Sequence, residues 1–129
     1  MTDPVSDFLI RLKNAGAARR EVVLMPYSNL KNSIGVALLK IGFVGSVVKH
    51  QKKVGAALEV GLVYENGKAK IKGVERVSKP SRRVYVGVRD IRKVKEGHGA
   101  LVLSTPKGIL TDKEARKEMV GGEALFKIW

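Results

Sequence analysis

The sequence predicts an α+β protein of two small lobes, an N-terminal αβαβββ lobe and a C-terminal β-rich lobe with one short helix. Apolar residues repeat at helical spacing in two segments near the N-terminus, and short strand-like runs bounded by turn residues follow them. A stretch of Ser, Pro and cations without periodicity interrupts both patterns at residues 77–83. We therefore expect an α/β lobe over residues 1–76, a basic linker over 77–83 and a second lobe over 84–129.

The first expected helix begins with Asp3 as N-cap and Pro4 as first helical residue. Apolar residues then recur at helical spacing as far as Leu12. The helix should end near 14–16, where Gly16 can supply a left-handed cap. The short apolar run 22–25, closed by a proline, is long enough for one strand.

A second helix is expected to begin at Ser28 or Asn29 and to end at Gly42. From there to residue 77 the residue pattern is typical of β-strands. Residues 66–67 are Asn-Gly, the strongest short hairpin signal. In the run 68–72, lysines alternate with apolar residues, which predicts a strand with one cationic face. That face could serve solubility or could face phosphates.

The second lobe is expected to consist of short elements in a defined order. A capping-box pattern predicts its single helix, and two glycines should end that helix. The expected elements are a strand at 84–88, a turn at 97–99, a strand at 100–103, a loop at 104–108, a helix from 111 to about 119 ended by 121–122, and a last strand at 123–129.

The composition is that of a globular, strongly basic chain. Of 129 residues, 44% are hydrophobic and 29% charged, and the formal net charge is +13. No apolar run approaches the roughly 18 residues of a membrane span, the N-terminus does not have the pattern of a secretory signal, and there is no cysteine. These features predict a cytoplasmic protein without a membrane partner. The positive charge predicts that its partner is a polyanion, above all nucleic acid.

The cations are concentrated in the middle of the chain. Between Lys68 and Lys95 lie 11 Lys and Arg residues, opposed only by Glu75 and Asp90, which gives a local net charge of 11 − 2 = +9. A run of cations can be simply a solvated face, but this density favours a surface that faces phosphates.

Signatures of catalysis are nearly absent from the sequence. There is no HExxH, GxSxG or Walker-type loop, and the two histidines are 48 residues apart. Asp112, Glu114 and Glu118 could be proposed as acid, base or metal ligands, but carboxylates in a short helix more often favour its dipole and its solvation. We predict no enzyme, no catalytic residue, no metal site and no cofactor.

Two polar features near the C-terminus could recognise RNA. The loop 104–108 carries two hydroxyls, a lysine and a flexible glycine after an apolar strand. Glu123 follows the glycine pair and could accept hydrogen bonds from a base or from a neighbouring hydroxyl. For the loop and for Glu123, the alternative interpretation is an ordinary polar turn and a strand-edge carboxylate.

Several motifs together resemble one family over essentially the whole chain. These are MTDPVSDFLIRLKNA at 1–15, SKPSRRVYVGV at 78–88, and LSTPKGILTDKEARKEMVGGEALFKIW at 103–129. They resemble bacterial small-subunit ribosomal protein eight, and the expected order of elements suits that family. Pro106 stands where the family more often has Ser, which removes one hydroxyl and one backbone N–H from the loop.

The resemblance implies a structural protein of the cytoplasmic ribosome. Its partners would be the central domain of the small-subunit rRNA, neighbouring small-subunit proteins and, in many bacteria, the mRNA of its own operon, whose translation it represses. It would bind rRNA early and nucleate assembly of the platform. Carried over to this sequence, the RNA contacts are Ser104, Thr105, Lys107, Gly108, Glu123 and Tyr85, with Lys79, Arg82 and Arg83 along the backbone and Asn14, Asn29 and Lys31 as a second contact.

Two other classes of function compete with this one. A free-standing RNA-binding regulator or RNA chaperone would use the same cations without a fixed complex. Preference for one folded RNA that persists at high salt separates a ribosomal protein from it. An enzyme of RNA metabolism would show turnover, for which the sequence offers no residues.

Overall fold

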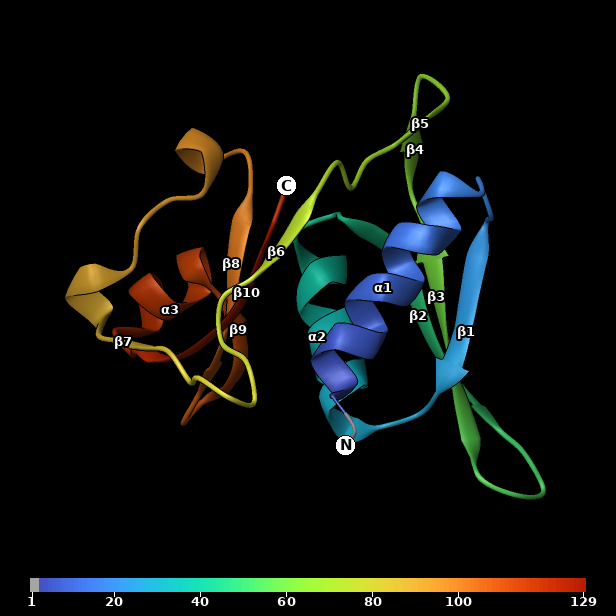
Figure 1. The fold of residues 1–129 in the computed structure, drawn as a ribbon, viewed down its shortest axis with the longest axis horizontal. Helices are drawn as coiled ribbons and strands as arrows, with labels where there is room; N and C mark the ends of the chain where they lie inside the picture. Colours follow the sequence, from blue (N-terminus) through green and yellow to red (C-terminus); the bar gives the residue numbers. More distant parts are fainter. Residues whose placement is uncertain (1–2) are drawn as a thin grey trace. The chain divides into compact units, whose positions relative to one another are not determined.

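The computed structural model describes residues 3–129 and divides the chain into two compact units, up to Ile71 and Lys72–Trp129 (Figure 1). Met1 and Thr2, with which the expected first lobe begins, lie outside the described residues. Helices and antiparallel sheets occur together, which confirms the α+β class. The domain boundaries expected from the sequence stay a prediction.

The first unit contains two helices and a three-stranded antiparallel sheet with the order β1-β3-β2. Phe8, Leu12, Ile34, Leu38 and Leu58 form its fully buried centre, since helices and sheet turn their apolar faces toward one another. Its elements are α1 Pro4–Ala17, β1 Val22–Pro26, α2 Asn29–Lys40, β2 Val44–Gln51, β3 Ala56–Leu62, β4 Tyr64–Glu65 and β5 Lys68–Ala69.

Helix α1 begins as expected and ends differently. The Asp3 carboxylate accepts a hydrogen bond from the Ser6 backbone N–H at 3.1 Å, which confirms the N-cap. The prediction that Gly16 is the left-handed cap is wrong: Ala17, a strong helix former, continues the helix, and Arg19 takes φ +56° instead. The Arg20 N–H then donates to the Ala15 carbonyl at 2.9 Å, which closes the helix end.

Helix α2 begins and ends at the expected signals. The Ser28 hydroxyl accepts from the Lys31 N–H at 3.1 Å, so Ser28 and not Asn29 is the N-cap. Gly42 takes φ +82°, and the Phe43 N–H returns to the Leu38 carbonyl at 3.0 Å. The prediction that Gly42 ends this helix is confirmed.

The Asn-Gly hairpin is present, but the expected lysine strand is not. Asn66 and Gly67 take φ +54° and +77° between the paired strands β4 and β5. Strand β5 ends at Ala69, and beyond it the Lys70 N–H makes one more backbone hydrogen bond, to the Val63 carbonyl at 2.9 Å. Lys70 then lies 3.7 Å from Glu65 and 5.9 Å from the centre of the Phe43 ring, so no regular cationic face forms.

The second unit is built on an antiparallel sheet with the strand order β6-β10-β8-β9, in which β7 also pairs with β10. Helix α3 covers a core of Leu103, Ala115, Ala124 and neighbouring apolar side chains. Its elements are β6 Val74–Arg76, β7 Tyr85–Val86, the 3-10 turns η1 Val88–Asp90 and η2 Lys95–Gly97, β8 Ala100–Thr105, β9 Gly108–Thr111, α3 Asp112–Glu118 and β10 Gly122–Ile128.

Two strands of this unit differ from the sequence prediction. The strand expected at 84–88 pairs only at Tyr85–Val86, because the chain turns into η1 after Gly87. The loop expected at 104–108 is a tight hairpin turn instead: Ser104 and Thr105 still pair within β8, and β9 begins at Gly108. A φ of +109° at Gly108 makes the tight return possible. Strand β9, which begins at this glycine, was not predicted from the sequence.

Helix α3 has the predicted capping box but not the predicted end. Thr111 and Glu114 each bond the other's backbone N–H, at 3.4 and 3.2 Å. Met119, with φ +56°, ends the helix before the glycine pair. Gly121 and Gly122 serve another purpose: a Cβ on Gly121 would overlap the Val86 carbonyl oxygen, and one on Gly122 would overlap that of Ser104. The pair lets β10 enter between β7 and β8.

Residues 77–83 contribute to the second unit through their backbone. The N–H groups of Val77 and Ser78 donate to the Leu125 and Ala124 carbonyls at 3.1 and 3.0 Å. Lys79 and Arg82 then exchange two backbone hydrogen bonds of 2.9 and 3.0 Å, which closes a tight turn. This segment is therefore held against β10 up to Ser78 and projects as a turn beyond it.

Candidate nucleic-acid interface

Three of the predicted RNA contacts stand in one row across the second sheet. Glu123 in β10 lies opposite Tyr85 in β7 on one side and opposite Ser104 in β8 on the other. Residues directly opposite one another on neighbouring strands project from the same face. The sheet therefore brings together Tyr85, Glu123 and Ser104, which are up to 38 positions apart in the sequence (123 − 85).

Glu123 is the centre of a polar cluster within the protein. Its Oε2 accepts hydrogen bonds from the Ser78 hydroxyl, at very short distance, and from Nη1 of Arg83 at 3.1 Å. Ser78 is fully buried, and its hydroxyl also accepts from the Val84 N–H at 3.2 Å. Since the Glu123 side chain is only 17% exposed, its first effect is to hold Arg83 and the start of β7 in place.

The hairpin between β8 and β9 carries Ser104 and three further predicted contacts, Thr105, Lys107 and Gly108. The Thr105 hydroxyl donates to the Gly108 carbonyl at 2.8 Å and accepts from the Lys107 N–H at 3.1 Å. Lys107 Nζ lies 3.3 Å from Glu118 Oε2 in α3. The Ser104 hydroxyl makes no hydrogen bond with any residue in 3–129, so it is the free hydroxyl of this hairpin.

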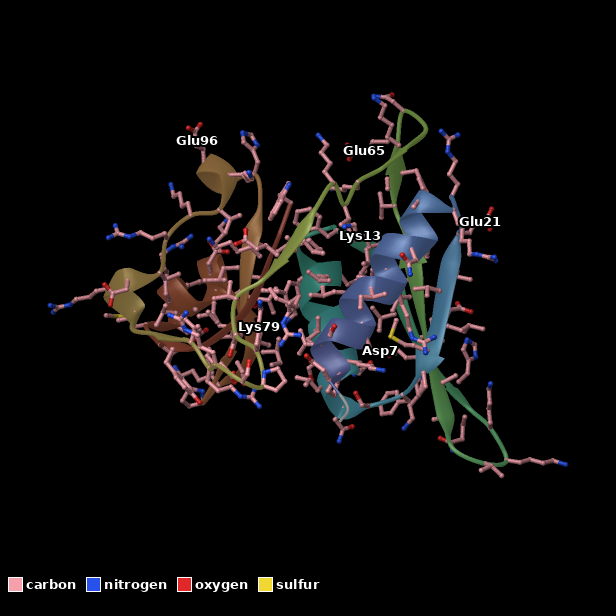
Figure 2. The ribbon with its side chains drawn as sticks, in the orientation of Figure 1. Asp7, Lys13, Glu21, Glu65, Lys79 and Glu96 are labelled. Atoms are coloured by element: carbon pink, nitrogen blue, oxygen red, sulfur yellow. The ribbon has the colours of Figure 1, made fainter. Side chains whose placement is uncertain are left out.

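The turn 79–82 and the neighbouring strand expose cations and an aromatic ring. Lys79 and Arg82 are exposed, and neither side chain has an ion-pair partner among the described residues; Lys79 is labelled in Figure 2. Tyr85 is 72% exposed, which is unusual for a tyrosine and leaves its ring free to stack. Arg83, by contrast, is about half exposed and paired with Glu123.

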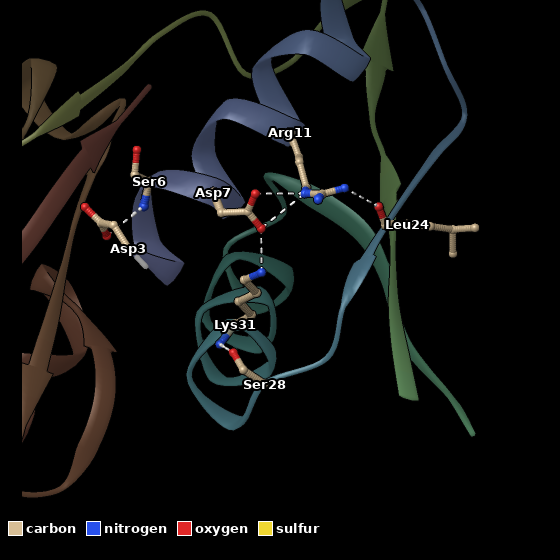
Figure 3. Close-up of polar contacts among 7 residues, drawn as sticks. All are labelled: Asp3, Ser6, Asp7, Arg11, Leu24, Ser28 and Lys31. Carbon is tan, nitrogen blue, oxygen red and sulfur yellow. Dashed lines mark hydrogen bonds and ion pairs between the residues drawn. The ribbon is translucent and has the colours of Figure 1, made fainter. Parts of the chain in front are cut away.

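The three predicted contacts of the first unit are in different situations. Asn14 is exposed near the end of α1, and exposed Asn29 accepts a hydrogen bond from the Tyr27 hydroxyl at 3.3 Å. Lys31 does not face solvent: its side chain is 8% exposed and its Nζ lies 2.5 Å from Asp7 Oδ2 (Figure 3). Its ammonium therefore supports the contact of α2 with α1.

Asp7 shows the electrostatic effect of this arrangement. The hydrogen bond from Lys31 holds the pKa of the Asp7 carboxyl below its usual value of 3.8, with help from Arg11 and against the effect of partial burial. Arg11 Nε lies 3.0 Å from Asp7 Oδ1, and its Nη1 donates to the Leu24 carbonyl at 3.2 Å (Figure 3). The three charged groups thus connect α1, α2 and β1.

The sequence prediction missed Ser78 as a functional residue. In the sequence it is one of two serines in a polar segment, and composition alone does not distinguish it from Ser81. In the structure Ser78 is buried under Arg76, whose guanidinium donates to the Ser78 carbonyl at 2.6 and 3.0 Å, while Ser81 is exposed. The signal that could have found it is the SKPxRRVY motif, in which Ser78 leads the cations.

Residues 3–129 contain neither a metal-binding cluster nor a membrane-spanning helix. No group of three His, Asp or Glu side chains lies close enough to hold a metal ion. No helix in this range is long and apolar enough to cross a membrane.

The site therefore combines exposed cations, an exposed aromatic ring and a free hydroxyl on a small α+β unit. This combination, with a formal charge of +13, is typical of RNA-binding proteins. The family described as ribosomal protein S8 matches residues 3–129. The chain belongs to this family.

Curated relatives agree with this assignment over their full length. The chain is 43% identical to small ribosomal subunit protein uS8 of Mycoplasmopsis agalactiae, over 100% of this chain and 98% of the relative. It is 45% identical to the proteins of the same name from Thermoanaerobacter sp. and Streptococcus gordonii, again over 100% of this chain and 98% of each relative.

Proposed function

We propose that the chain is a structural constituent of the small ribosomal subunit in the cytoplasm and binds the central domain of the small-subunit rRNA directly. It is not an enzyme in this proposal. Family membership supports the place in the subunit. The observation that carries RNA binding is the row Tyr85–Glu123–Ser104 beside Lys79 and Arg82, two exposed cations without an ion pair in the described residues 3–129.

The parts of this surface have different roles in binding. Lys79 and Arg82 attract phosphates and set the orientation of the RNA without reading its sequence. The Tyr85 ring stacks on an unpaired base, and the Ser104 hydroxyl bonds a base edge or a ribose hydroxyl. Glu123 acts through Arg83 and Ser78, so its contribution is to hold the cationic turn beside the ring.

The same surface is suited to two further tasks. Binding before other proteins would order the central domain and nucleate assembly of the platform, with neighbouring small-subunit proteins joining afterwards. An mRNA of its own operon that folds like the rRNA site would compete for the same residues and be repressed. Asn14 and Asn29 on the first unit would add a second contact, whereas buried Lys31 would contribute only through its fold.

A footprint on naked small-subunit rRNA tests the proposal. Hydroxyl radicals should leave a protected region confined to the central domain, and an RNA fragment of that region should compete for binding. A Tyr85→Ala variant should weaken this protection, because a stacked ring contributes about 1–3 kcal/mol. Protection spread over the whole rRNA, or none, would show that the family's rRNA site is not used by this chain.

A further inference from the structure

The second unit holds a cavity of about 460 Å³ between its sheet and the irregular segment 90–95. The apolar part of the wall consists of Val77, Val86, Val94, Leu101, Ala124 and Trp129. The volume of the cavity and its mainly apolar wall are those of small-molecule sites.

Cations surround the cavity. Arg92, Lys93, Lys95 and Lys127 line it, against the carboxylates of Glu75 and Asp90, which gives 4 − 2 = +2. Arg92, Lys93 and Lys127 form no ion pair with any residue in 3–129. Lys95 Nζ lies 4.8 Å from the centre of the Trp129 ring. An anionic group at this rim would therefore meet Arg92, Lys93 and Lys127, whose charges are not neutralised within residues 3–129.

The backbone of the segment adds hydrogen-bonding capacity and strain. Within the described part of the chain, the N–H groups of Arg92 and Lys93 donate to no acceptor. Lys95 and Glu96 then take φ +49° and +56° in succession, a conformation that side chains disfavour. The N–H groups of Gly97 and Gly99 hold the turn by donating to the Val94 carbonyl at 3.0 Å each. Such strain is common beside ligand sites.

The wall of the cavity also contains a well-fixed aromatic ring. The Trp129 carbonyl accepts from the Lys72 and Gly73 N–H groups at 2.6 and 3.0 Å. A Cβ on Gly73 would lie 2.7 Å from the indole, so the ring is packed against bare backbone there. An indole and apolar side chains beside a cationic rim are complementary to a heteroaromatic ring that carries a phosphate.

We propose that this cavity is a nucleotide site. The base lies among Val77, Leu101 and Trp129, and the phosphate lies at the exposed cations Arg92 and Lys93. The nucleotide is either a free mononucleotide or an unpaired nucleotide of an RNA, since both present the same ring and phosphate. The site goes beyond the proposed rRNA surface and does not depend on Tyr85, Ser104 or Lys79.

Equilibrium dialysis of the full chain against labelled adenosine monophosphate measures binding, and fluorescence locates it. Trp129 is the only tryptophan, so its emission, excited at the red edge where bases do not absorb, reports on this cavity. The other probes are inorganic phosphate, adenosine and a single-stranded oligoadenylate. We expect saturable binding that changes Trp129 emission, and weaker binding of phosphate and adenosine alone.

Two charge variants show whether the nucleotide binds at the cavity or is attracted only by the overall positive charge of the protein. Arg92→Ala with Lys93→Ala should weaken binding at least about tenfold, because two charge-assisted contacts are lost. Lys113→Ala with Lys117→Ala removes two exposed cations from α3 of the same unit and should change binding by less than about twofold. Circular dichroism checks that both variants fold, and neither pair removes a buried side chain.

The binding results distinguish a free mononucleotide from an unpaired RNA nucleotide and can contradict the proposed site. Binding of the mononucleotide supports a free ligand, and binding of the oligonucleotide alone supports an unpaired RNA nucleotide. The proposal fails if no probe binds saturably, if phosphate alone binds as tightly as the nucleotide, or if both charge variants weaken binding equally. Since rRNA footprinting is measured separately, failure here would leave the proposed rRNA surface untouched.

Discussion

At the scale of single residues, the structure separates polar groups that are free from polar groups that are already used. Ser104 and Thr105 are adjacent hydroxyl residues, yet only Thr105 is engaged, with Gly108 and Lys107. Arg82 and Arg83 are adjacent cations, yet only Arg83 is paired, with Glu123. Neighbours that look equivalent in the sequence therefore have different effects when substituted.

The two hydroxyls should respond differently to substitution. Ser104→Ala should lower affinity for the central-domain rRNA about 5- to 30-fold, the equivalent of about 1–2 kcal/mol for a lost hydrogen bond. It should change stability by less than about 0.5 kcal/mol, because no internal bond is broken. Thr105→Val should instead lower the free energy of unfolding by about 1 kcal/mol by releasing the turn. Filter binding and urea unfolding measure the two effects, and equal behaviour of both variants would contradict the assignment.

Asp7 makes the stability of the first unit dependent on pH. Its pKa is lowered in the folded protein, chiefly by the hydrogen bond from Lys31, so the folded state binds fewer protons than the unfolded state at moderately acid pH. The stabilisation is therefore complete above about pH 5 and is lost as pH falls through the lowered pKa. Because Asp7 is 39% exposed, solvent screening limits the effect to about 1 kcal/mol.

Urea unfolding of Asp7→Asn tests this pH dependence. The variant should be less stable than the original protein at pH 7 and about equally stable below the lowered pKa, where the original carboxyl is protonated. The double variant with Lys31→Met serves as control, because an apolar side chain removes the buried ammonium that would otherwise lack its partner. A loss of stability of the same size at both pH values would show that Asp7 acts through packing and not through charge.

The sequence predicted the kinds of residue at the candidate site better than their engagement. Tyr85, Lys79 and Arg82 were named from the motif and are exposed. A neighbouring hydroxyl is one of the partners that the sequence predicts for Glu123, but the sequence does not identify Ser78 as that hydroxyl, because the contact joins residues 45 positions apart. Burial of Lys31 was also hidden, since its partner Asp7 lies in the other helix. Long-range contacts of this kind depend on packing, which local patterns do not contain.

At the scale of elements, helix starts were easier to predict than helix ends. Asp3, Ser28 and Thr111 are side-chain caps that leave a local sequence signature, and all three accept the expected backbone hydrogen bond. Helix ends were assigned to glycines, which was right at Gly42 and wrong for α1 and α3. At the ends of those helices Arg19 and Met119 take the left-handed conformation, while Gly16 lies inside α1 and the pair 121–122 allows close approach of β10 to its neighbours.

Glycine substitutions at the two helix ends and an alanine substitution at Gly122 in β10 should therefore change the free energy of unfolding in opposite directions. Arg19→Gly and Met119→Gly should each raise the free energy of unfolding by about 0.5–1 kcal/mol, because glycine adopts φ near +56° without steric cost. Gly122→Ala should lower it by about 3 kcal/mol or more, because a Cβ there overlaps the Ser104 carbonyl. Urea unfolding measures all three. Destabilisation by both glycine substitutions would show that the Arg19 and Met119 side chains make contributions larger than the backbone cost.

At the scale of the whole molecule, charge and its distribution decide how the protein meets RNA. The +13 charge attracts any polyanion, so it cannot by itself distinguish the ribosomal proposal from a free-standing RNA chaperone. Preference for one folded RNA requires that the exposed cations, which bind phosphates, act separately from the side chains that contact bases or ribose. In the second unit, Lys79 and Arg82 supply charge without internal partners, whereas Arg83 is joined through Glu123 to the row that includes Tyr85 and Ser104.

The salt dependence of binding should reveal this separation. Lys79→Ala with Arg82→Ala should weaken binding to all RNAs alike and reduce the slope of log K against log salt by about 1.4–1.8, at 0.7–0.9 for each phosphate contact. Arg83→Ala should reduce the slope by about half as much and also lower the preference for the central-domain rRNA, because Glu123 and the start of β7 lose their anchor. Lys113→Ala with Lys117→Ala on α3 is the matched control and should leave the preference and most of the slope unchanged. Loss of preference in the Lys79 and Arg82 variant, with an unchanged slope, would mean that these cations read the RNA and that the row across the sheet does not.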